Sequence, residues 1–271
     1  VVRHSPQRGA LALGLMCAVL VMKPLVFGRL GGFYDDARRH FPFLEPALPL
    51  ECTRTKEGPL VICLIKTAPH NVERRRKLRG NWGALRVHGV TVHRRFLCGR
   101  ECFDNEELRR EVEEEGDIIV IDFEDSYRNL THKMVYGTLR WPATLCPAAD
   151  FIVQLDDDVR VNVSNVVQYL SCPSTYPDCT ETTSIEALAQ TSFVAGRIVT
   201  GVEPFRANSK WAVTYDEWPG HTYPSYPEGK VIILSQRSVQ DLYPVALKTD
   251  FFWIDDVYLG ILTENTDTKL Y

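Results

Sequence analysis

The sequence lacks an excess of basic residues, since 31 Lys and Arg stand against 35 Asp and Glu and the formal net charge is −4. Proteins that bind nucleic acid concentrate positive charge, so we expect no nucleic-acid partner. The cysteines lack the Cys-x-x-Cys spacing of zinc sites, which argues against a structural zinc domain. Internal repeats and low-complexity tracts are also missing. What remains is a 45% hydrophobic chain of 271 residues, which indicates a globular body.

The N-terminal part contains one long apolar run, which extends from Ala10 to Met22 and resumes after Lys23 and Pro24. A membrane span needs roughly 20 apolar residues, so we expect residues 10–30 to be a signal anchor behind an incomplete cytoplasmic tail, residues 1–9. A cleaved signal peptide is the alternative, and both interpretations predict entry into the secretory pathway. Residues 31–59 are proline-rich without periodicity and predict an extended stem, so the folded body is expected at residues 60–271.

Two sequons and most of the cysteines follow this segment. Asn129 and Asn162 each begin an Asn-x-Ser/Thr sequon, which predicts glycosylation on the lumenal side of a secretory membrane. Cys172 and Cys179 flank a turn-rich loop that a local disulfide could close, whereas Cys63 lies in an apolar run and is expected to be a buried thiol. An oxidising compartment fits this distribution best.

Strand-like and helix-like segments alternate through the body, which predicts an α/β fold with a mostly parallel sheet flanked by helices. The expected strands are 60–67, 91–98, 117–122, 151–155, 193–200 and 231–234. The expected helices are 71–82, 104–115, 130–145, 163–170, 236–243 and one that begins at 255.

Three consecutive carboxylates, Asp156, Asp157 and Asp158, follow the predicted strand 151–155. Adjacent carboxylates repel one another, and a divalent cation relieves this repulsion while taking the oxygen ligands it prefers. Ligands of open α/β sheets collect beyond the carboxyl ends of the strands. A solvated turn is the alternative, but direct attachment to a buried strand favours a metal and nucleotide site.

Two other groups of charged residues have both a functional and an ordinary interpretation. Arg75 and Arg79 are four residues apart on one helix face and could bind a diphosphate, although charge alone favours an ordinary solvated basic face. The metal and nucleotide site suggested by the triplet adds weight to the diphosphate interpretation. Asp255 and Asp256 precede a predicted helix, where Asp is a preferred N-cap. In the functional interpretation, one carboxylate caps the helix and its neighbour acts as a general base.

Aromatic side chains gather in the second half of the chain and suit either carbohydrate stacking or ordinary loop packing. They are Trp211, Tyr215, Trp218, Tyr223 and Tyr226.

Five motifs in order resemble the β-1,3-glycosyltransferase family that includes β-1,3-galactosyltransferases and β-1,3-N-acetylglucosaminyltransferases, with Fringe proteins as distant relatives. Residues 75–83 are similar to the family's Arg-Arg…Ile-Arg-x-Thr-Trp segment, and residues 122–133 to its Asp-Phe-x-Asp-Ser-Tyr-x-Asn-Leu-Thr-x-Lys signature. The other matching segments are 156–162, 209–211 and 254–260.

The resemblance implies a Golgi membrane enzyme of single-pass type II topology with a lumenal GT-A-like domain. It implies a UDP-galactose or UDP-N-acetylglucosamine donor, a glycan acceptor, Mn²⁺ and inversion at the anomeric carbon. Carried onto this chain, Asp156 and Asp158 are the metal ligands, Asp256 is the catalytic base, and Arg75, Arg79, Asp156 and Asp157 bind the donor.

Two departures from the family pattern accompany these matches. The segment from Tyr223 to Lys230 lacks a cysteine and a glycine-rich turn that the family usually has, and the family's metal-binding His is expected downstream of Tyr271. We therefore expect either a C-terminally truncated chain or an incomplete metal site. The alternative functions are a non-catalytic relative that serves as a binding or chaperone partner of a Golgi glycosyltransferase and a secreted metal-dependent phosphohydrolase.

Overall fold

The computed structural model describes residues 40–49, 52, 58–81, 85–171 and 184–271. The predicted cytoplasmic tail and signal anchor, much of the predicted stem and the Cys172 and Cys179 loop lie outside these ranges. Within them, none of the helices has the length and apolar character needed to cross a membrane.

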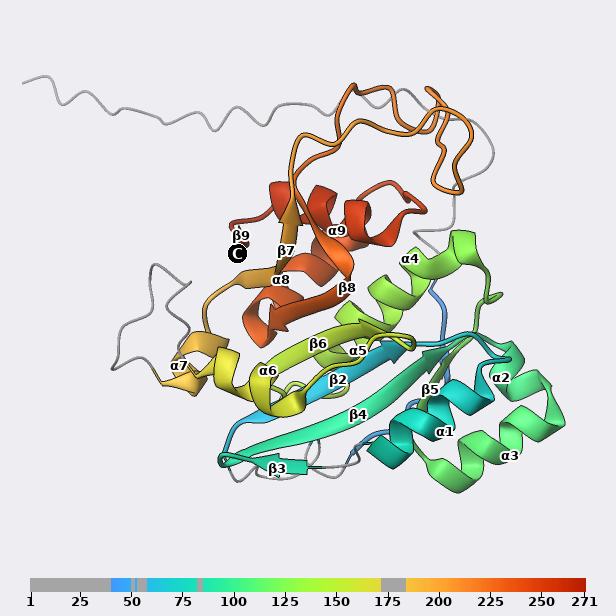
Figure 1. The fold of residues 1–271 in the computed structure, drawn as a ribbon, viewed down its shortest axis with the longest axis vertical. Coiled ribbons are helices and arrows are strands. Elements are labelled where there is room, and N and C mark those ends of the chain that lie inside the picture. Colours follow the sequence, from blue (N-terminus) through green and yellow to red (C-terminus); the bar gives the residue numbers. More distant parts are fainter. Residues whose placement is uncertain (1–39, 50–51, 53–57, 82–84, 172–183) are drawn as a thin grey trace, which may run out of the picture. The chain divides into compact units, whose positions relative to one another are not determined.

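Within the described ranges, nine strands form one sheet in the order β1-β5-β4-β2-β6-β8-β7-β9, with β3 paired beside β4 (Figure 1). Their bounds are β1 Phe43–Glu45, β2 Leu60–Lys66, β3 Leu85–Val87, β4 Val90–Cys98, β5 Ile118–Ile121, β6 Phe151–Asp156, β7 Phe193–Val199, β8 Tyr226–Ser235 and β9 Lys269–Leu270. The expectation of a mostly parallel sheet was wrong in part. The centre, β5-β4-β2-β6, is parallel, but β8 runs antiparallel to both β6 and β7, and β1 runs antiparallel to β5, so the sheet is mixed.

Helices cover both faces of the sheet because its central strands are buried on both sides. Strand β2 shows this most clearly: Ile62 and Leu64 pack with one hydrophobic cluster, while Cys63 and Ile65 pack with the other. The helices are α1 Val72–Asn81, α2 Glu101–Asp104, α3 Glu106–Glu115, the 3₁₀ turn η3 Tyr127–Asn129, α4 Leu130–His132, the π-helical η4 Lys133–Arg140, α5 Trp141–Thr144, α6 Val163–Leu170, α7 Ile185–Ala189, α8 Gln236–Ala246 and α9 Asp255–Glu264. The cluster on the Ile62 side includes residues of η4, α8 and α9, and the other includes residues of α3, α6 and α7.

The folded body begins before the predicted boundary at residue 60. Strand β1 pairs with β5, Ala47 is buried in the core, and Cys52 forms a disulfide with Cys146. The prolines of this segment flank a short edge strand, a position where their missing N–H groups are tolerated. Part of the predicted stem is therefore packed onto the domain.

The other described cysteines are Cys98 and Cys102, which form a disulfide, and Cys63, which is a buried free thiol. Cys98 is disulfide-bonded to Cys102 across the turn that joins β4 to α2. Cys63 is free and buried, as predicted, and burial raises the pKa of its thiol to about 12. The Cys63 thiol is therefore uncharged at neutral pH and behaves as a core side chain.

Candidate functional site

The candidate site lies at the sheet edge where β2 and β6 end. These neighbouring strands are parallel, and the last paired residues are Lys66 and Asp156. Parallel pairing brings both carboxyl ends to the same edge, so the Asp triplet stands beside the end of β2. This is the position at which open α/β sheets bind ligands.

Lys66 joins two motifs that lie about a hundred residues apart in the sequence. Its Nζ lies 2.6 Å from Asp255 Oδ2 and 3.2 Å from Asp156 Oδ1, and the side chain is only 4% exposed. Burial alone would lower the pKa of Lys66, but the two carboxylates raise it above its usual value. Its ammonium therefore stays charged and holds the start of α9 against the end of β6. Sequence analysis missed Lys66; its signal is a basic residue that ends an apolar strand.

The three aspartates of the triplet have different environments. Asp157 is buried and accepts hydrogen bonds from Thr67 Oγ1 at 2.7 Å, Asn71 Nδ2 at 2.8 Å and Arg74 Nη1 at 2.7 Å. These hydrogen bonds hold the start of α1 against the turn after β6. The prediction that Asp157 binds the donor remains a prediction.

Asp156 and Asp158 are the two accessible carboxylates of the triplet. Their side chains are 41% and 65% exposed. Burial raises the pKa of Asp156, and the charges of Asp255 and Asp158 add to this rise while Lys66 opposes it. The negative charge at this edge is therefore incompletely balanced, which favours a bound cation.

The carboxylate oxygens of Asp156 and Asp158 suit a hard divalent cation that is also coordinated by a bound ligand. Across the residues that the structure describes, no group of three or more His, Cys, Asp or Glu side chains is arranged to hold a metal. Asp156 and Asp158 supply two carboxylates from one turn. Magnesium-type sites are commonly built in this way, with one or two carboxylates completed by water and substrate phosphates.

Asp256 lies in the first turn of α9, beside the cluster that Lys66 organises. Its Oδ1 accepts a hydrogen bond from the Val257 N–H at 2.8 Å. Burial raises the pKa of Asp256 to about 6, the charge of Asp255 contributes further, and the N–H groups of Val257 and Gly229 lower it. A carboxylate with this pKa is mostly ionised near neutral pH and is a stronger base than an ordinary Asp, which suits a general base.

The expectation that one of the two aspartates caps α9 was wrong. The N-cap residue is Ile254, which makes no side-chain capping bond. Asp255 instead forms the ion pair with Lys66. The pair of aspartates is thus held by tertiary contacts, and helix capping does not explain its presence.

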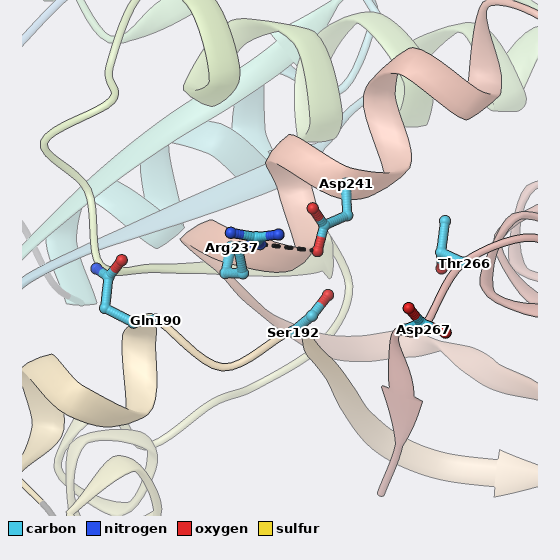
Figure 2. A pocket seen from close by; sticks show the side chains of 6 residues that line it. All are labelled: Gln190, Ser192, Arg237, Asp241, Thr266 and Asp267. Carbon is cyan, nitrogen blue, oxygen red and sulfur yellow. Dashed lines mark hydrogen bonds and ion pairs between the residues drawn. The ribbon is translucent and has the colours of Figure 1, made fainter. Parts of the chain in front are cut away.

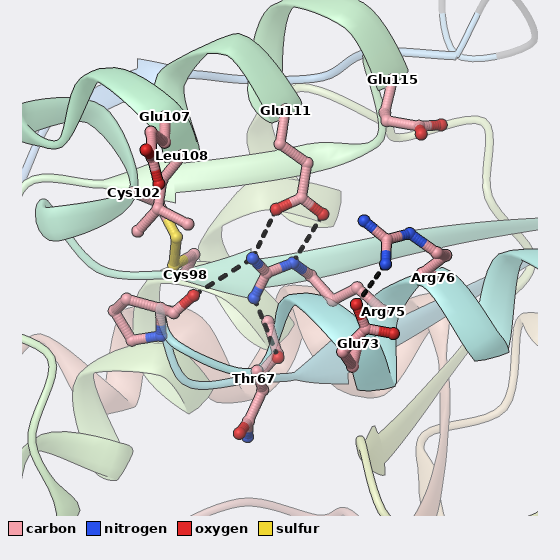
Figure 3. A network of polar contacts seen from close by, with 12 residues as sticks. Thr67, Glu73, Arg75, Arg76, Cys98, Cys102, Glu107, Leu108, Glu111 and Glu115 are labelled. Carbon is pink, nitrogen blue, oxygen red and sulfur yellow. Dashed lines mark hydrogen bonds and ion pairs between the residues drawn. A yellow bond between two sulfur atoms is a disulfide. The ribbon is translucent and has the colours of Figure 1, made fainter.

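Arg75 is completely buried and has protein partners on every guanidinium nitrogen (Figure 3). Nε and Nη2 donate to the Glu111 carboxylate at 2.9 and 2.5 Å, while Nη1 donates to the Ala68 carbonyl at 2.9 Å and Nη2 to the Pro69 carbonyl at 3.1 Å. This geometry anchors α1 to α3 and to the turn after β2. It gives Arg75 a structural role and leaves its predicted donor contact without support.

Arg79 is engaged in the same way one turn later. It donates to Glu111 at 2.6 Å and to both oxygens of Asp117, at 2.8 and 3.0 Å. These contacts raise the pKa of Arg79 above its usual value although burial alone would lower it. Like Arg75, it contributes to an ion-pair network between helices, and its predicted phosphate contact remains a prediction.

The two predicted glycosylation sites lie at or near the surface. Asn129 is partly exposed and donates from Nδ2 to the Glu124 carbonyl at 2.9 Å. Asn162 is exposed and caps α6, accepting from the Ser164 N–H at 2.9 Å. Glycan attachment at either residue remains a prediction.

Two open cavities lie outside this cluster. One, of about 450 Å³, is lined by residues that include the Arg237 and Asp241 ion pair (Figure 2). It lies at the opposite end of the strands from the Asp triplet, because Ser235, two residues before Arg237, pairs with Phe151, the first residue of β6. Five residues of strand separate the two ends, which is roughly 17 Å. The second, of about 370 Å³, includes Arg160 and Asn162, just after the triplet.

Comparison with known proteins decides the family. The sequence profile described as Galactosyltransferase matches residues 73–271, which contain the Asp triplet and Asp256. The chain belongs to the galactosyltransferase family. The predicted family resemblance is therefore confirmed.

Curated members of the family align with most of this chain. Beta-1,3-galactosyltransferase 1 of Mus musculus is 31% identical over 211 residues, covering 76% of this chain and 60% of the relative. Beta-1,3-galactosyltransferase 4 of Rattus norvegicus is 33% identical, covering 79% and 62%. A human acetylgalactosaminyl-O-glycosyl-glycoprotein beta-1,3-N-acetylglucosaminyltransferase is 33% identical, covering 83% and 57%. The chain thus spans about three fifths of the length of these relatives.

Among solved structures, 4-diphosphocytidyl-2C-methyl-D-erythritol synthase from Anaerococcus prevotii aligns with a TM-score of 0.37 and 10% identity, over 79% of this chain and 89% of that one. The bifunctional glycosyltransferase WbbM aligns with a TM-score of 0.37 and 13% identity, over 80% and 39%.

Proposed function

We propose that this protein is an inverting, metal-dependent β-1,3-glycosyltransferase with a GT-A-like domain. It transfers galactose, or alternatively N-acetylglucosamine, from a UDP-sugar to a terminal sugar of a glycoprotein or glycolipid. The family assignment supports glycosyl transfer, and the names of the relatives in both subfamilies support these two donors.

The observation that carries the proposal is the junction at Lys66. One buried ammonium contacts Asp156 of the triplet and Asp255, the neighbour of Asp256. A transferase needs its donor-binding group and its base close together, so that the acceptor hydroxyl meets the anomeric carbon between them. The contacts of Lys66 hold the two carboxylate motifs close together, which supports the proposal.

In the proposed reaction, Asp256 removes the proton from the acceptor hydroxyl as its oxygen attacks the anomeric carbon of the donor. The bond from that carbon to the diphosphate breaks, and its electron pair leaves with UDP. Attack from the face opposite UDP inverts the anomeric configuration without a covalent intermediate, as in inverting glycosidases. Lys66 keeps Asp255 neutralised, so that only the Asp256 carboxylate at the start of α9 carries an unpaired charge.

A divalent cation is the implied cofactor, and the accessible oxygens of Asp156 and Asp158 fit it. When bound there, Mn²⁺ would offset the charge of the diphosphate leaving group. Asp157 supports these two residues by fixing the turn through its contacts with Thr67, Asn71 and Arg74.

We also propose that the protein resides in the Golgi membrane with its body on the lumenal side. The apolar run at residues 10–30 and the two sequons motivate this location. The disulfides Cys52–Cys146 and Cys98–Cys102 support an oxidising compartment. Immunofluorescence of the tagged full chain, combined with glycosidase sensitivity, tests it; cytosolic staining without glycosylation would refute it.

Release of UDP by the purified full chain tests the catalytic proposal. We expect turnover with UDP-galactose or UDP-N-acetylglucosamine in the presence of Mn²⁺ and a panel of β-galactoside and N-acetylhexosaminide acceptors. EDTA should abolish this turnover, and added Mn²⁺ should restore it. Failure of every donor and acceptor pair, with tight metal-dependent UDP binding retained, would favour the non-catalytic relative instead.

A further inference from the structure

Exposed aromatic side chains are concentrated in one region of the described structure. Six large hydrophobic side chains are exposed among the described residues, and four of them belong to η3 or to the connection between β7 and β8, shown in orange in Figure 1. These four are Tyr127, Phe205, Trp211 and Tyr215. Isolated exposed apolar residues need no explanation, but a group of aromatic ones indicates a binding surface.

The aromatic residues of this connection form an inner and an outer group. In the inner group, the rings of Trp218 and Tyr223 pack against each other and against Phe252, which lies between α8 and α9, with centroids 5.3 to 5.9 Å apart. Tyr223 and Phe252 are only 7% and 6% exposed. The inner group is therefore part of the packed body, whereas Tyr127, Phe205, Trp211 and Tyr215 remain exposed.

Two of the exposed aromatic side chains, Tyr127 and Trp211, lie around one lysine, Lys210. Lys210 Nζ lies 4.5 Å from the centroid of the Trp211 ring and 5.3 Å from that of the Tyr127 ring. Tyr127 and Trp211 are 46% and 43% exposed. Within the described residues, no carboxylate forms an ion pair with Lys210. We call Tyr127, Lys210 and Trp211 the aromatic platform.

The platform adjoins the proposed catalytic base. The Tyr127 ring lies 6.3 Å from the ring of Trp253, which precedes α9 by two residues. Burial raises the pKa of Tyr127, and the charges of Asp255 and Asp256 raise it further. The contact with Trp253 therefore places Tyr127 near the start of α9, the helix that carries Asp255 and Asp256.

Ion-pair and hydrogen-bond contacts fix the platform in place. Arg128, next to Tyr127, donates to Glu217 at 2.9 Å, and Glu217 accepts the Thr214 N–H at 2.8 Å. Arg206 donates to four carbonyl groups of the connection, including that of Gly220 at 2.8 Å. The segments that carry Tyr127 and Trp211 are thus tied together before any ligand arrives, which lowers the entropic cost of binding.

We propose that the aromatic platform binds the acceptor sugar, with one face of a pyranose ring stacked on Trp211 and Tyr127 and a hydroxyl group of that ring accepting a hydrogen bond from Lys210. The inference rests on the proposed function, since it assigns the substrate side of the same site. Aromatic rings with a polar edge suit a ligand that has an apolar face and hydroxyl groups at its rim. Position beside Asp256 selects the acceptor as the occupant.

Sugar binding by the full chain, measured without donor by saturation-transfer NMR, tests the proposal. The probes are methyl β-galactoside, methyl β-N-acetylglucosaminide and methyl α-N-acetylgalactosaminide. We expect at least one to bind, Trp211→Ala to weaken it about 10-fold or more, and Trp211→Phe to retain most of the affinity because the stacking face remains. Lys210→Met should weaken binding less. Leu247→Ala, an exposed apolar residue of another segment, serves as the matched control.

Two further measurements distinguish the loss of the sugar-binding platform from unfolding of the variant and from failure of the catalytic proposal. Thermal unfolding should be the same for Trp211→Ala and wild type, because Trp211 is a surface residue, and UDP affinity in Mn²⁺ should also be unchanged. Wild-type sugar affinity in both Trp211→Ala and Lys210→Met, or no binding of any probe to the wild type, would overturn the platform. Sugar binding that depends on Trp211 in a chain without UDP release would uphold the platform and refute the catalytic proposal.

Discussion

Two clusters of charged residues border the same helix, α1, and differ in how completely their charges are matched. On one side, three guanidinium groups meet three carboxylates, those of Arg75, Arg79 and Arg94 with Glu111, Glu115 and Asp117. On the other side, two cations, Lys66 and Arg74, pair with four carboxylates, those of Asp156, Asp157, Asp158 and Asp255, and Asp256 follows Asp255 in the chain. The first cluster is closed and balanced, whereas the second has an excess of negative charge and accessible oxygens.

The difference separates structural charge from functional charge. A buried ion pair with all its donors satisfied has no further capacity to bind a ligand, as Arg75 illustrates. Asp156 and Asp256 instead have raised pKa values, because both are desolvated beside further carboxylates. Such unfavourable electrostatics are typical of functional sites, where a cation or a proton transfer relieves them. Substitutions in each cluster should therefore have different effects on stability and on activity.

The largest effect should come from Asp256→Asn. Loss of the base should lower kcat about 10²- to 10⁴-fold, while UDP affinity in Mn²⁺ stays near that of the wild type. Steady-state kinetics and UDP titration measure the two quantities. Loss of UDP affinity together with turnover would place Asp256 in the donor site and would contradict its assignment as the base.

The same variant has a second expected result, which follows from the sign of the pKa shift. Because the pKa of Asp256 is raised from 3.8 to about 6 on folding, its ionisation costs folding free energy as the pH rises from about 4 to 6. Asp256→Asn should therefore have an equal or higher melting temperature than wild type at pH 7, and this difference should shrink below pH 4. A strong loss of stability at pH 7 would indicate a structural role.

Arg75→Met should act on the closed cluster and lower the free energy of unfolding by about 3 to 5 kcal/mol, because Glu111 would remain buried with fewer partners. Arg76→Met is the matched control on the same helix, since Arg76 is exposed and forms only a surface pair with Glu73. That pair should contribute at most about 1 kcal/mol. Chemical denaturation measures both values. A stable Arg75→Met variant with weakened UDP binding would instead restore the predicted donor contact.

Strong local patterns made most of the fold predictable from the sequence. The apolar segments 60–67 and 151–155 have the composition of buried strands, and both form strands of the sheet, β2 and β6. Their pairing with each other was not predicted, because composition does not say which strands are neighbours. The antiparallel direction of β8 was not predictable in this way, because a strand's apolar pattern is the same in either direction. Strand β1 was missed because the prolines around it dominated the local composition.

The site was predictable only as separate motifs. Proximity of Asp156 to Asp255 depends on Lys66, whose two contacts span 90 and 189 residues of sequence. Helix periodicity correctly placed Arg75 and Arg79 on one face but could not tell whether that face met a phosphate or Glu111. Whether a charged side chain has a structural or a functional role depends on the group it pairs with, and that group is brought close only by the tertiary fold.

Asp158→Asn tests the open cluster on its metal side. Removal of one accessible carboxylate should weaken metal-dependent UDP binding on the order of 100-fold, because a cation's contribution amounts to several kcal/mol. Folding stability should be nearly unchanged, since the side chain is 65% exposed. Calorimetric titration of UDP with Mn²⁺ and with EDTA measures the effect, and Asp104→Asn, another exposed carboxylate, is the control. Equal UDP affinity in the variant and the wild type would remove Asp158 from the metal site.

The pH dependence of turnover gives the smallest effect and the finest comparison of the two clusters. Asp256 must be ionised to accept a proton, so kcat/KM should fall about tenfold per pH unit below pH 6 and level off above it. Arg79 of the closed cluster has a pKa raised above its usual value and should add no inflection in this range. A steady-state profile from pH 4.5 to 8 measures the curve, with unfolding followed in parallel to exclude acid denaturation. A flat profile through pH 6 would show that proton removal by a carboxylate of this pKa does not limit the reaction.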